Sequence, residues 1–280
     1  YTIAMTMLLL DIGRPDRFYH GFIFWNVHSV LWEVTMCVGL YFTVLLLENI
    51  PVVAALPWLN AHFPKLTGRM QKLHDFAPVL AIFGLGFSLL HQSSLGATYG
   101  VLIARPIWYR PGIAVLCILS AVLGGLALTA LATSLVKRIS PRTAVDQNIL
   151  DRVARFLGWG MLFYLYWRFW DAFAMTYTYQ PGRSEGLALL TGGLLSFNFW
   201  IGEILIGAVF PVIILLHPRW RANHLLRDGA LALIVGGVIA YRWNTNLIGQ
   251  LIVQPPYDGP LQYTSYVPSL IEFGAALGAI

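Results

Sequence analysis

The sequence predicts an all-α, polytopic membrane protein, a helical bundle with about eight visible spans. The 280-residue chain is 58% hydrophobic and only 11% charged, whereas soluble domains carry about 25% charged residues. Apolar runs of about 20 residues, enough to cross a bilayer as a helix, recur from end to end. Only helices and closed β-barrels satisfy all backbone hydrogen bonds inside a bilayer. Because these runs do not alternate in polarity as barrel strands do, they are predicted to be helices. These observations exclude a soluble globule.

Hydropathy and the intervening polar breaks place the spans in order. They are expected near residues 1–11, 24–48, 76–104, 112–136, 153–179, 188–216, 228–250 and 265–280. Breaks bearing Pro and Gly, such as "DIGRP", "RPIWYRPG" and "VQPPYDGP", separate several of them. The first and last spans look trimmed, so we expect a longer native chain. Residues 1–280 are expected to form a single integral membrane domain.

The distribution of basic residues predicts the orientation of the chain. Most Lys and Arg lie in the loops at 49–75, 137–152 and 217–227. Loops rich in these residues stay in the cytoplasm, so the "DIGRPDRFYHGF" and "QPPYDGPLQY" loops are expected outside. The net charge of +5 is mostly this topological bias. It does not indicate nucleic-acid binding.

Ionisable residues interrupt the apolar spans. Counted at ~1.5 Å per residue, seven of them fall within the outer two thirds of the bilayer: Glu33, His91, Arg168, Asp171, Glu203, Arg242 and Glu272. Polar neighbours at helical spacing extend them into stripes: Asn26, Ser29 and Glu33; Ser88, His91, Gln92 and Tyr99; Tyr164, Arg168 and Asp171; Arg242, Thr245, Asn246 and Gly249. Because lipid cannot solvate such groups, they should face the bundle interior. We therefore expect a cavity in the outer half of the bundle.

Structural roles compete with functional ones at these positions. Arg168 and Asp171, at i and i+3, can form an intrahelical ion pair that only locks the bundle. His91 can be a satisfied core histidine, and His28, near the interface, can be solvated. Glu33 and Glu203 have no basic neighbour in sequence, so a purely structural role needs a partner from another helix.

The polar inventory favours a quinone site over haem. A bis-histidine haem needs two facing histidines inside the membrane, and only His91 lies deep in a span. A quinone needs an apolar slot, donors for its carbonyl oxygens and groups that pass protons. The candidates for this pocket are Asn26, His28, His91, Gln92, Tyr99, Arg168, Asp171 and Arg242. No metal site is expected.

Four stretches resemble a known family. "DIGRPDRFYHGF", "NVHSVLWEV", "LLHQSSLG" and "YTSYVPSLIEF" are similar to the NrfD-type membrane subunit of polysulfide reductase and its relatives. The resemblance extends along the whole chain. It is greatest to the quinone-reactive, HybB-like membrane subunit of hydrogenase-2-type nickel-iron hydrogenases, and next to the membrane subunit of the sulfite-reduction-linked Dsr complex.

The resemblance implies an architecture and partners. It implies two four-helix bundles, no haem or iron–sulfur cluster in this chain, and a menaquinone or ubiquinone site near the outer face. The expected location is a bacterial or archaeal cytoplasmic (inner) membrane. A ferredoxin-type iron–sulfur subunit would dock outside, at the family loop matched by Asp11, Arg14 and Arg17. The catalytic subunits would be of nickel-iron hydrogenase or sulfur-metabolism type.

The functional hypothesis is therefore a quinone-interacting subunit of a respiratory oxidoreductase, not catalytic alone. Protons would move through Glu33, His91 and Glu203. The resemblance implies an inward relay of acids that gives Glu33 and Glu203 this role, and His91 matches the histidine of the family's HQSS stretch. Two alternatives stay open. A proton-coupled secondary transporter would use the same acids and would have inverted repeats and broken helices, and a structural membrane anchor would pair all its buried charges.

Overall fold

The computed structural model describes residues 6, 13–140, 146–253, 259–272 and 274 of the chain. They are mostly helical and fall into two compact units. Unit 1 is Tyr1–Thr98 with Val267–Ile280, and unit 2 is Tyr99–Tyr266. Of the predicted span near 1–11 only Thr6 is described. Of the span near 265–280, residues 265–272 and 274 are described, and the predicted span starts too early, because 265–269 are not helical and helical residues begin at Leu270.

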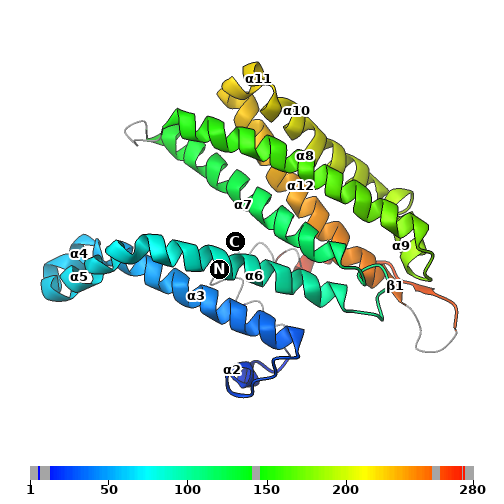
Figure 1. Cartoon of the computed structure of the whole chain (residues 1–280), viewed down its shortest axis with the longest axis horizontal. Coiled ribbons are helices and arrows are strands. Elements are labelled where there is room, and N and C mark those ends of the chain that lie inside the picture. The colour runs from blue at the N-terminus through cyan, green and yellow to red at the C-terminus, as the bar shows by residue number, and fades with distance from the viewer. Residues whose placement is uncertain (1–5, 7–12, 141–145, 254–258, 273, 275–280) are drawn as a thin grey trace. The chain divides into compact units, whose positions relative to one another are not determined.

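Unit 1 is built on two long helices, α3 and α6 (Figure 1). Its elements are η1 (Pro15–Arg17), α2 (His20–Ile23), α3 (Val30–Ala54), α4 (Pro57–His62), α5 (Pro64–Gln71), η2 (Lys72–Phe76) and α6 (Ala77–Gly100). Helix α3 begins at Val30 because the Ser29 side chain accepts a hydrogen bond from the Trp32 backbone N–H, as an N-cap residue does. The span predicted at 24–48 thus starts too early.

Unit 2 is a four-helix bundle of α7, α8, the continuous η3–α10 rod and α12 (Figure 1). Its elements are α7 (Gly112–Ile139), α8 (Gln147–Tyr177), α9 (Arg183–Thr191), η3 (Asn198–Val209), α10 (Phe210–Leu216), α11 (Pro218–Ala222), α12 (His224–Leu251), β1 (Ile252–Val253) and β2 (Gln262–Tyr263). The two short strands pair antiparallel, with Ile252 opposite Tyr263. One of the two expected four-helix bundles is thus present among the described residues.

The span predicted at 188–216 is broken near its start. Helix α9 ends at Thr191, and the next helical segment, η3, begins at Asn198. Gly192 and Gly193 open the break, and a Cβ at Gly193 would lie 2.8 Å from the Leu189 Cα. Glycine is a poor helix former and here permits a turn that a larger residue would block.

Apolar side chains and two glycines hold the bundle of unit 2 together. Leu116, Leu157 and Ile234, from α7, α8 and α12, are all 0% exposed. Where η3 crosses α12, a Cβ on Gly207 or Gly237 would overlap the backbone of the other helix. The two helices therefore approach backbone to backbone, as small residues allow in membrane bundles.

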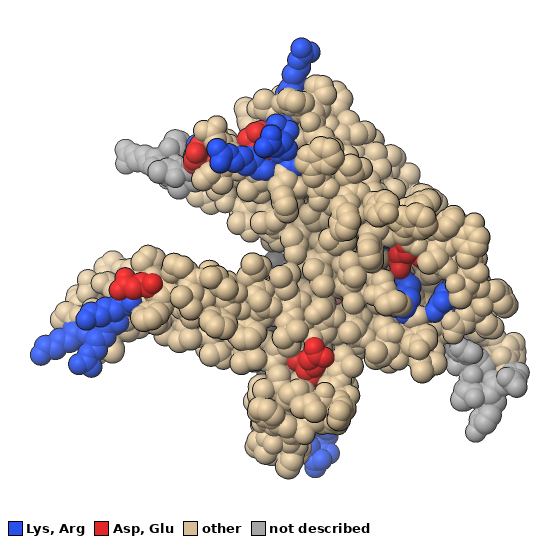
Figure 2. Space-filling view, viewed as in Figure 1, with Lys and Arg blue, Asp and Glu red and all other residues tan. Residues whose placement is uncertain are grey.

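The chain is an all-α polytopic membrane protein. Five helical stretches among the described residues are long and apolar enough to cross a bilayer: Val30–Ala54, Pro64–Gly100, Gly112–Ile139, Asn198–Leu216 and His224–Leu251. Helix α8 is not among these five stretches: it is longer than α7, α10 or α12, but it contains more charged residues than they do. Large apolar side chains such as Ile82, 71% exposed, cover the outside of these helices, as lipid contact requires. Figure 2 shows the visible charged side chains of unit 2 gathered toward its two ends.

Candidate functional site

The centre of unit 2 holds a chain of buried ion pairs. Arg168 and Asp171 lie one turn apart on α8, with Arg168 NH1 3.1 Å from Asp171 Oδ2. On its other side, Arg168 donates from Nε to Glu203 Oε1 in η3 at 2.8 Å. The expected intrahelical pair is present, and Glu203 has its basic partner on another helix. All three side chains are at most 4% exposed.

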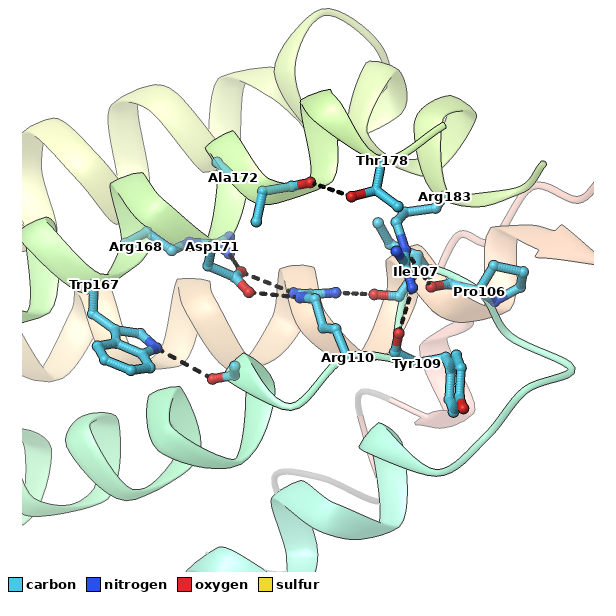
Figure 3. A network of polar contacts seen from close by, with 12 residues as sticks. Pro106, Ile107, Tyr109, Arg110, Trp167, Arg168, Asp171, Ala172, Thr178 and Arg183 are labelled. Carbon is cyan, nitrogen blue, oxygen red and sulfur yellow. Dashed lines mark hydrogen bonds and ion pairs between the residues drawn. The ribbon is translucent and has the colours of Figure 1, made fainter. Parts of the chain in front are cut away.

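Arg110, a loop residue, extends this series of buried ion pairs beyond the helices. Arg110, in the segment between α6 and α7, donates from Nε to Asp171 Oδ1 at 2.7 Å and from NH2 to Oδ2 at 3.1 Å. This is the bidentate geometry that suits guanidinium and carboxylate. Figure 3 shows Arg110 between Asp171 and the Ile107 carbonyl, to which its NH1 also donates.

A second arginine fixes the same loop from α9. Arg183 donates to the backbone carbonyls of Pro106, at 3.1 Å, and Tyr109, at 2.5 Å (Figure 3). Arg183 is positioned by the turn before it, where Gly182 has φ +82° and its N–H donates to Glu185 Oε2 at 2.7 Å. Burial and the positive charge of Arg110 lower the pKa of Arg183 from its ordinary value. Arg110 thus anchors the loop to α8, and Arg183 anchors it to α9.

Glu203 is enclosed by donors from two helices, α8 and α12. Tyr164 on α8 donates its hydroxyl to Oε1 at 3.0 Å, and Asn244 on α12 donates Nδ2 to Oε2 at 2.9 Å. Asn198, at the start of η3, in turn donates to Asn244 Oδ1 at 2.7 Å. Glu203 is 1% exposed, and each of its carboxylate oxygens accepts a hydrogen bond. A buried acid without such partners would be costly.

The network is electrically balanced. Arg110 and Arg168 supply two positive charges, and Asp171 and Glu203 supply two negative ones. Desolvating four charges is expensive, and only close pairing with full hydrogen bonding offsets it. The Phe199 ring adds a cation–π contact, with its centroid 5.2 Å from Arg168 Cζ. A balanced network can serve only to hold the helices together. It can also serve proton transfer, because protonating Asp171 or Glu203 would change the charge felt by the other acid.

Glu203 sits in a π-helical segment. Element η3 keeps the π form over 12 residues, although π-helix is rare and concentrates at functional sites. A π turn holds more residues than an α turn, and in this register Gly207 meets α12 while Glu203 faces Arg168. Apolar residues make up most of the segment. The segment thus combines an unusual backbone with a buried carboxylate, and neither is typical of a simple membrane helix.

A second polar group lies at the α9 end of the bundle. The Tyr99 hydroxyl donates to Asn246 Oδ1 at 2.6 Å, and the Tyr99 ring packs edge-on against Trp108, with centroids 4.9 Å apart. Trp108 covers Gly249, whose lack of a Cβ makes room for it, and donates to the Thr245 carbonyl at 2.6 Å. Tyr99 and Asn246, which belong to two of the predicted stripes, thus contact each other, and Asn246 is exposed rather than buried in the bundle.

Arg242, the remaining predicted pocket residue of unit 2, turns toward α7. It donates from NH2 to the Cys117 carbonyl at 2.9 Å. The guanidinium also lies 5.9 Å from the Tyr241 ring centroid. These contacts place it on the bundle interior, beside the network of Arg168.

In unit 1, Glu33 lies on α3 and contacts α6. Ser94, which is 1% exposed, donates its hydroxyl to Glu33 Oε1 at 2.7 Å. His91 and Gln92 lie on α6, within the same helical stretch as Ser94. Asn26 and His28 precede α3, so the predicted helical stripe of Asn26, Ser29 and Glu33 is wrong, because the helix starts at the Ser29 cap and does not include Asn26. The Asn26 side chain instead accepts from the His28 N–H at 3.3 Å.

The predicted docking residues are partly visible. Arg14 and Arg17 flank Asp16, at 3.4 and 3.9 Å, and all three side chains are more than half exposed. Asp11 lies outside the described residues. Exposure leaves both arginines available to a partner surface. The residues proposed as a relay divide between the units, with Glu33 and His91 in unit 1 and Glu203 in unit 2.

Comparison with known proteins supplies the family. The family described as "Polysulphide reductase, NrfD" matches residues 1–254. The chain belongs to the NrfD family. This NrfD-family chain is 32% identical to "Menaquinone reductase, integral membrane subunit" of Nitratidesulfovibrio vulgaris, over 99% of this chain and 67% of that protein. The resemblance inferred from the four sequence stretches is therefore confirmed.

Two further relatives extend the comparison. The chain is 23% identical to a subunit of the selenate reductase of Mesobacillus selenatarsenatis, over 99% of this chain and 70% of that protein. It is 24% identical to "Probable Ni/Fe-hydrogenase 2 b-type cytochrome subunit" of Escherichia coli, over 98% of this chain and 66% of that protein. The NrfD-family chain thus spans about two thirds of the length of these relatives.

Sequence patterns did not reveal three members of the network. Arg110 falls in a loop that the sequence places outside the membrane, and neither Asn198 nor Asn244 is among the expected pocket residues. The signal for Asn244 was present, since it lies two residues from Arg242 in a cluster of polar residues, "RWNTN". Arg110 carried no comparable signal, because its partner Asp171 is 61 residues away.

Proposed function

We propose that this chain is the quinone-interacting integral membrane subunit of a respiratory oxidoreductase complex. In this proposal electrons pass between an iron–sulfur subunit on the outer side and the membrane quinone pool, and protons pass through buried acids. The observation that carries the proposal is Glu203, a carboxylate 1% exposed inside an apolar π-helical span. The NrfD-family assignment and the relative named as a menaquinone reductase subunit support it.

The chemistry of the Tyr99 group fits a quinone. A quinone, when bound, accepts or gives electrons together with protons. The Asn246 amide N–H₂ can donate to a quinone carbonyl oxygen, and the Tyr99 hydroxyl orients that amide by donating to its Oδ1 at 2.6 Å. Both side chains are accessible enough to meet a ligand. Trp108 supplies an aromatic wall beside them. These side chains would bind and orient the quinone carbonyl oxygens, while the charged network of Arg168 handles protons.

In the proposal Glu203 exchanges protons, with Tyr164 and Asn244 holding its two oxygens. Arg168 is shared by Glu203 and Asp171 through contacts of 2.8 and 3.1 Å. Protonation of either acid therefore changes the hold of Arg168 on the other. Glu33 and His91 in unit 1 remain proposed members of the relay, and Arg14 and Arg17 remain proposed contacts of the iron–sulfur subunit.

The test compares two activities of the purified complex. One is turnover with a quinone analogue, and the other is turnover of the same donor with a soluble dye that bypasses the membrane subunit. Glu203→Gln keeps the size of the side chain and removes its proton exchange, so we expect quinone turnover to fall at least about tenfold while dye turnover is kept. Asp75→Asn, a change to an exposed acid in η2 of unit 1, should leave both activities unchanged.

A structural anchor is the competing function, and the complete pairing of Arg168, Asp171 and Glu203 favours it. If the network only locks the bundle, Glu203→Gln complexes that assemble will retain quinone turnover. Should Glu203→Gln fail to assemble, Tyr164→Phe removes a single hydroxyl from the same carboxylate and takes its place. Unchanged quinone turnover in both variants would contradict the proposal.

A further inference from the structure

A polar cavity lies at the end of unit 2 remote from Tyr99. It has a volume of about 510 Å³ and opens where α7 ends and α8 and α12 begin. Its lining includes Ser134, Lys137, Arg138, Gln147, His224 and Arg227. Figure 2 shows basic side chains gathered at this end of the unit. Neither the proposed quinone site nor the relay uses this cavity.

The charges around the cavity leave a positive excess. Arg221 is paired with Asp151 at 2.7 Å. Asp228 accepts from the Ser134 hydroxyl at 2.7 Å and pairs with both Arg138 and Arg227. One carboxylate thus serves two guanidinium groups, and Lys137 adds a further positive charge. With the α8 cap Asp146 included, four basic side chains and three acids at this end leave a balance of one positive charge.

One donor in the lining is buried without a hydrogen bond. Arg227 is 4% exposed, and its Nε makes no hydrogen bond to the described residues. Its nearest acid, Asp228, is 3.6 Å away, and its NH2 has a 3.3 Å contact with Gln147. Buried donors are normally satisfied. An acceptor placed in the cavity would complete this one.

The helix ends add to the attraction for an anion. Helix α12 starts at this cavity with His224 and is capped by the neutral side chain of Asn223. Its N-terminal end therefore keeps the positive field of the helix dipole. Helix α8 starts here as well, but Asp146 caps it and offsets its field. The basic side chains and the N-terminal end of α12, which no acid caps, together favour binding of a phosphate group.

The surroundings identify the source of that phosphate. Exposed apolar side chains lie within one turn of the lining residues on three helices: Ile139 at 85%, Leu225 at 62% and Ile149 at 58%. A soluble anion would make no favourable contact with these apolar side chains, whereas the acyl chains of a phospholipid would pack against them. We propose that this cavity binds the phosphate of an anionic phospholipid headgroup. Basic pockets at the ends of membrane helices are suited to such headgroups.

The test is lipid-dependent stabilisation of the purified complex in detergent. We expect phosphatidylglycerol to raise the unfolding midpoint of this subunit by several degrees and phosphatidylcholine, at the same concentration, to have little effect. Lys137→Gln should remove most of the rise. Arg152→Gln is the matched control, because it removes an equal charge near the start of α8, is exposed and does not line the cavity.

The other outcomes also decide the matter. A rise with inorganic phosphate alone, lost in Lys137→Gln, would support the phosphate site but assign it to a soluble anion. An equal rise with phosphatidylcholine, or the same phosphatidylglycerol response in Lys137→Gln as in the unchanged protein, would overturn the proposal. Native mass spectrometry provides a second readout: Lys137→Gln should retain less phosphatidylglycerol than Arg152→Gln or the unchanged protein, and equal retention in all three would overturn the proposal.

Discussion

The Arg168 guanidinium on α8 and the Glu203 carboxylate in η3 form an ion pair with Nε 2.8 Å from Oε1, and the two side chains are 4% and 0% exposed. The pair ties the π-helical segment to its neighbour and sets the electrostatic environment of the acid proposed to move protons. Arg168 also holds Asp171 at 3.1 Å. Loss of this one guanidinium would therefore leave two buried acids short of a counter-charge.

Arg168→Gln is predicted to destabilise unit 2 strongly. Breaking a buried ion pair by removing one partner costs ~3–5 kcal/mol, and Asp171 would keep only Arg110. Thermal unfolding in detergent should show a lower midpoint. Arg155→Gln, an exposed change on the same helix, should shift it little. The double variant Arg168→Gln with Glu203→Gln should recover part of the loss, and no recovery would mean that the two side chains are not coupled.

The sequence predicted the helices of this site better than its contacts. Spacing alone predicted the buried face of α8, because Tyr164, Arg168 and Asp171 recur at the helical period, and all three are at most 8% exposed. Hydropathy could not predict the break at Gly192, since the flanking residues are apolar on both sides. Nor could hydropathy predict the ion pair of Arg110 with Asp171, because a contact between a loop and a distant helix depends on the tertiary fold rather than on local periodicity.

The crossing of η3 and α12 predicts an asymmetric response to two neighbouring glycines. Gly237→Ala would push a methyl into the Gly207 backbone, whereas a Cβ on Gly236 would have open space within 4 Å. Overpacking of this kind costs about 1–3 kcal/mol. We expect Gly237→Ala to lower the unfolding midpoint and Gly236→Ala to leave it unchanged or slightly higher. Equal effects of the two would mean that the helices do not cross this closely.

Glu33 provides a test of the relay in unit 1. The Ser94 hydroxyl on α6 donates to Glu33 Oε1 at 2.7 Å, and the amide oxygen of a Gln side chain can still accept that hydrogen bond. Glu33→Gln should therefore preserve assembly and abolish quinone-linked turnover if the acid exchanges protons. Glu48→Gln, on the same helix, is the control. Full turnover and full proton coupling in both Glu33→Gln and Glu203→Gln would remove the relay from consideration.

The Tyr99 group predicts a specific effect on quinone affinity. Tyr99→Phe removes the hydroxyl that lies 2.6 Å from Asn246 Oδ1 but keeps the ring against Trp108, so the fold should be retained. A single hydrogen bond contributes about 0.5–1.5 kcal/mol, which corresponds to a rise of roughly two- to twelvefold in the apparent KM for a quinone analogue. Dye turnover should not change. Tyr177→Phe, at a side chain 74% exposed on α8, controls for the loss of a phenol, and an equal change in KM there would mean that Tyr99 does not contact the quinone.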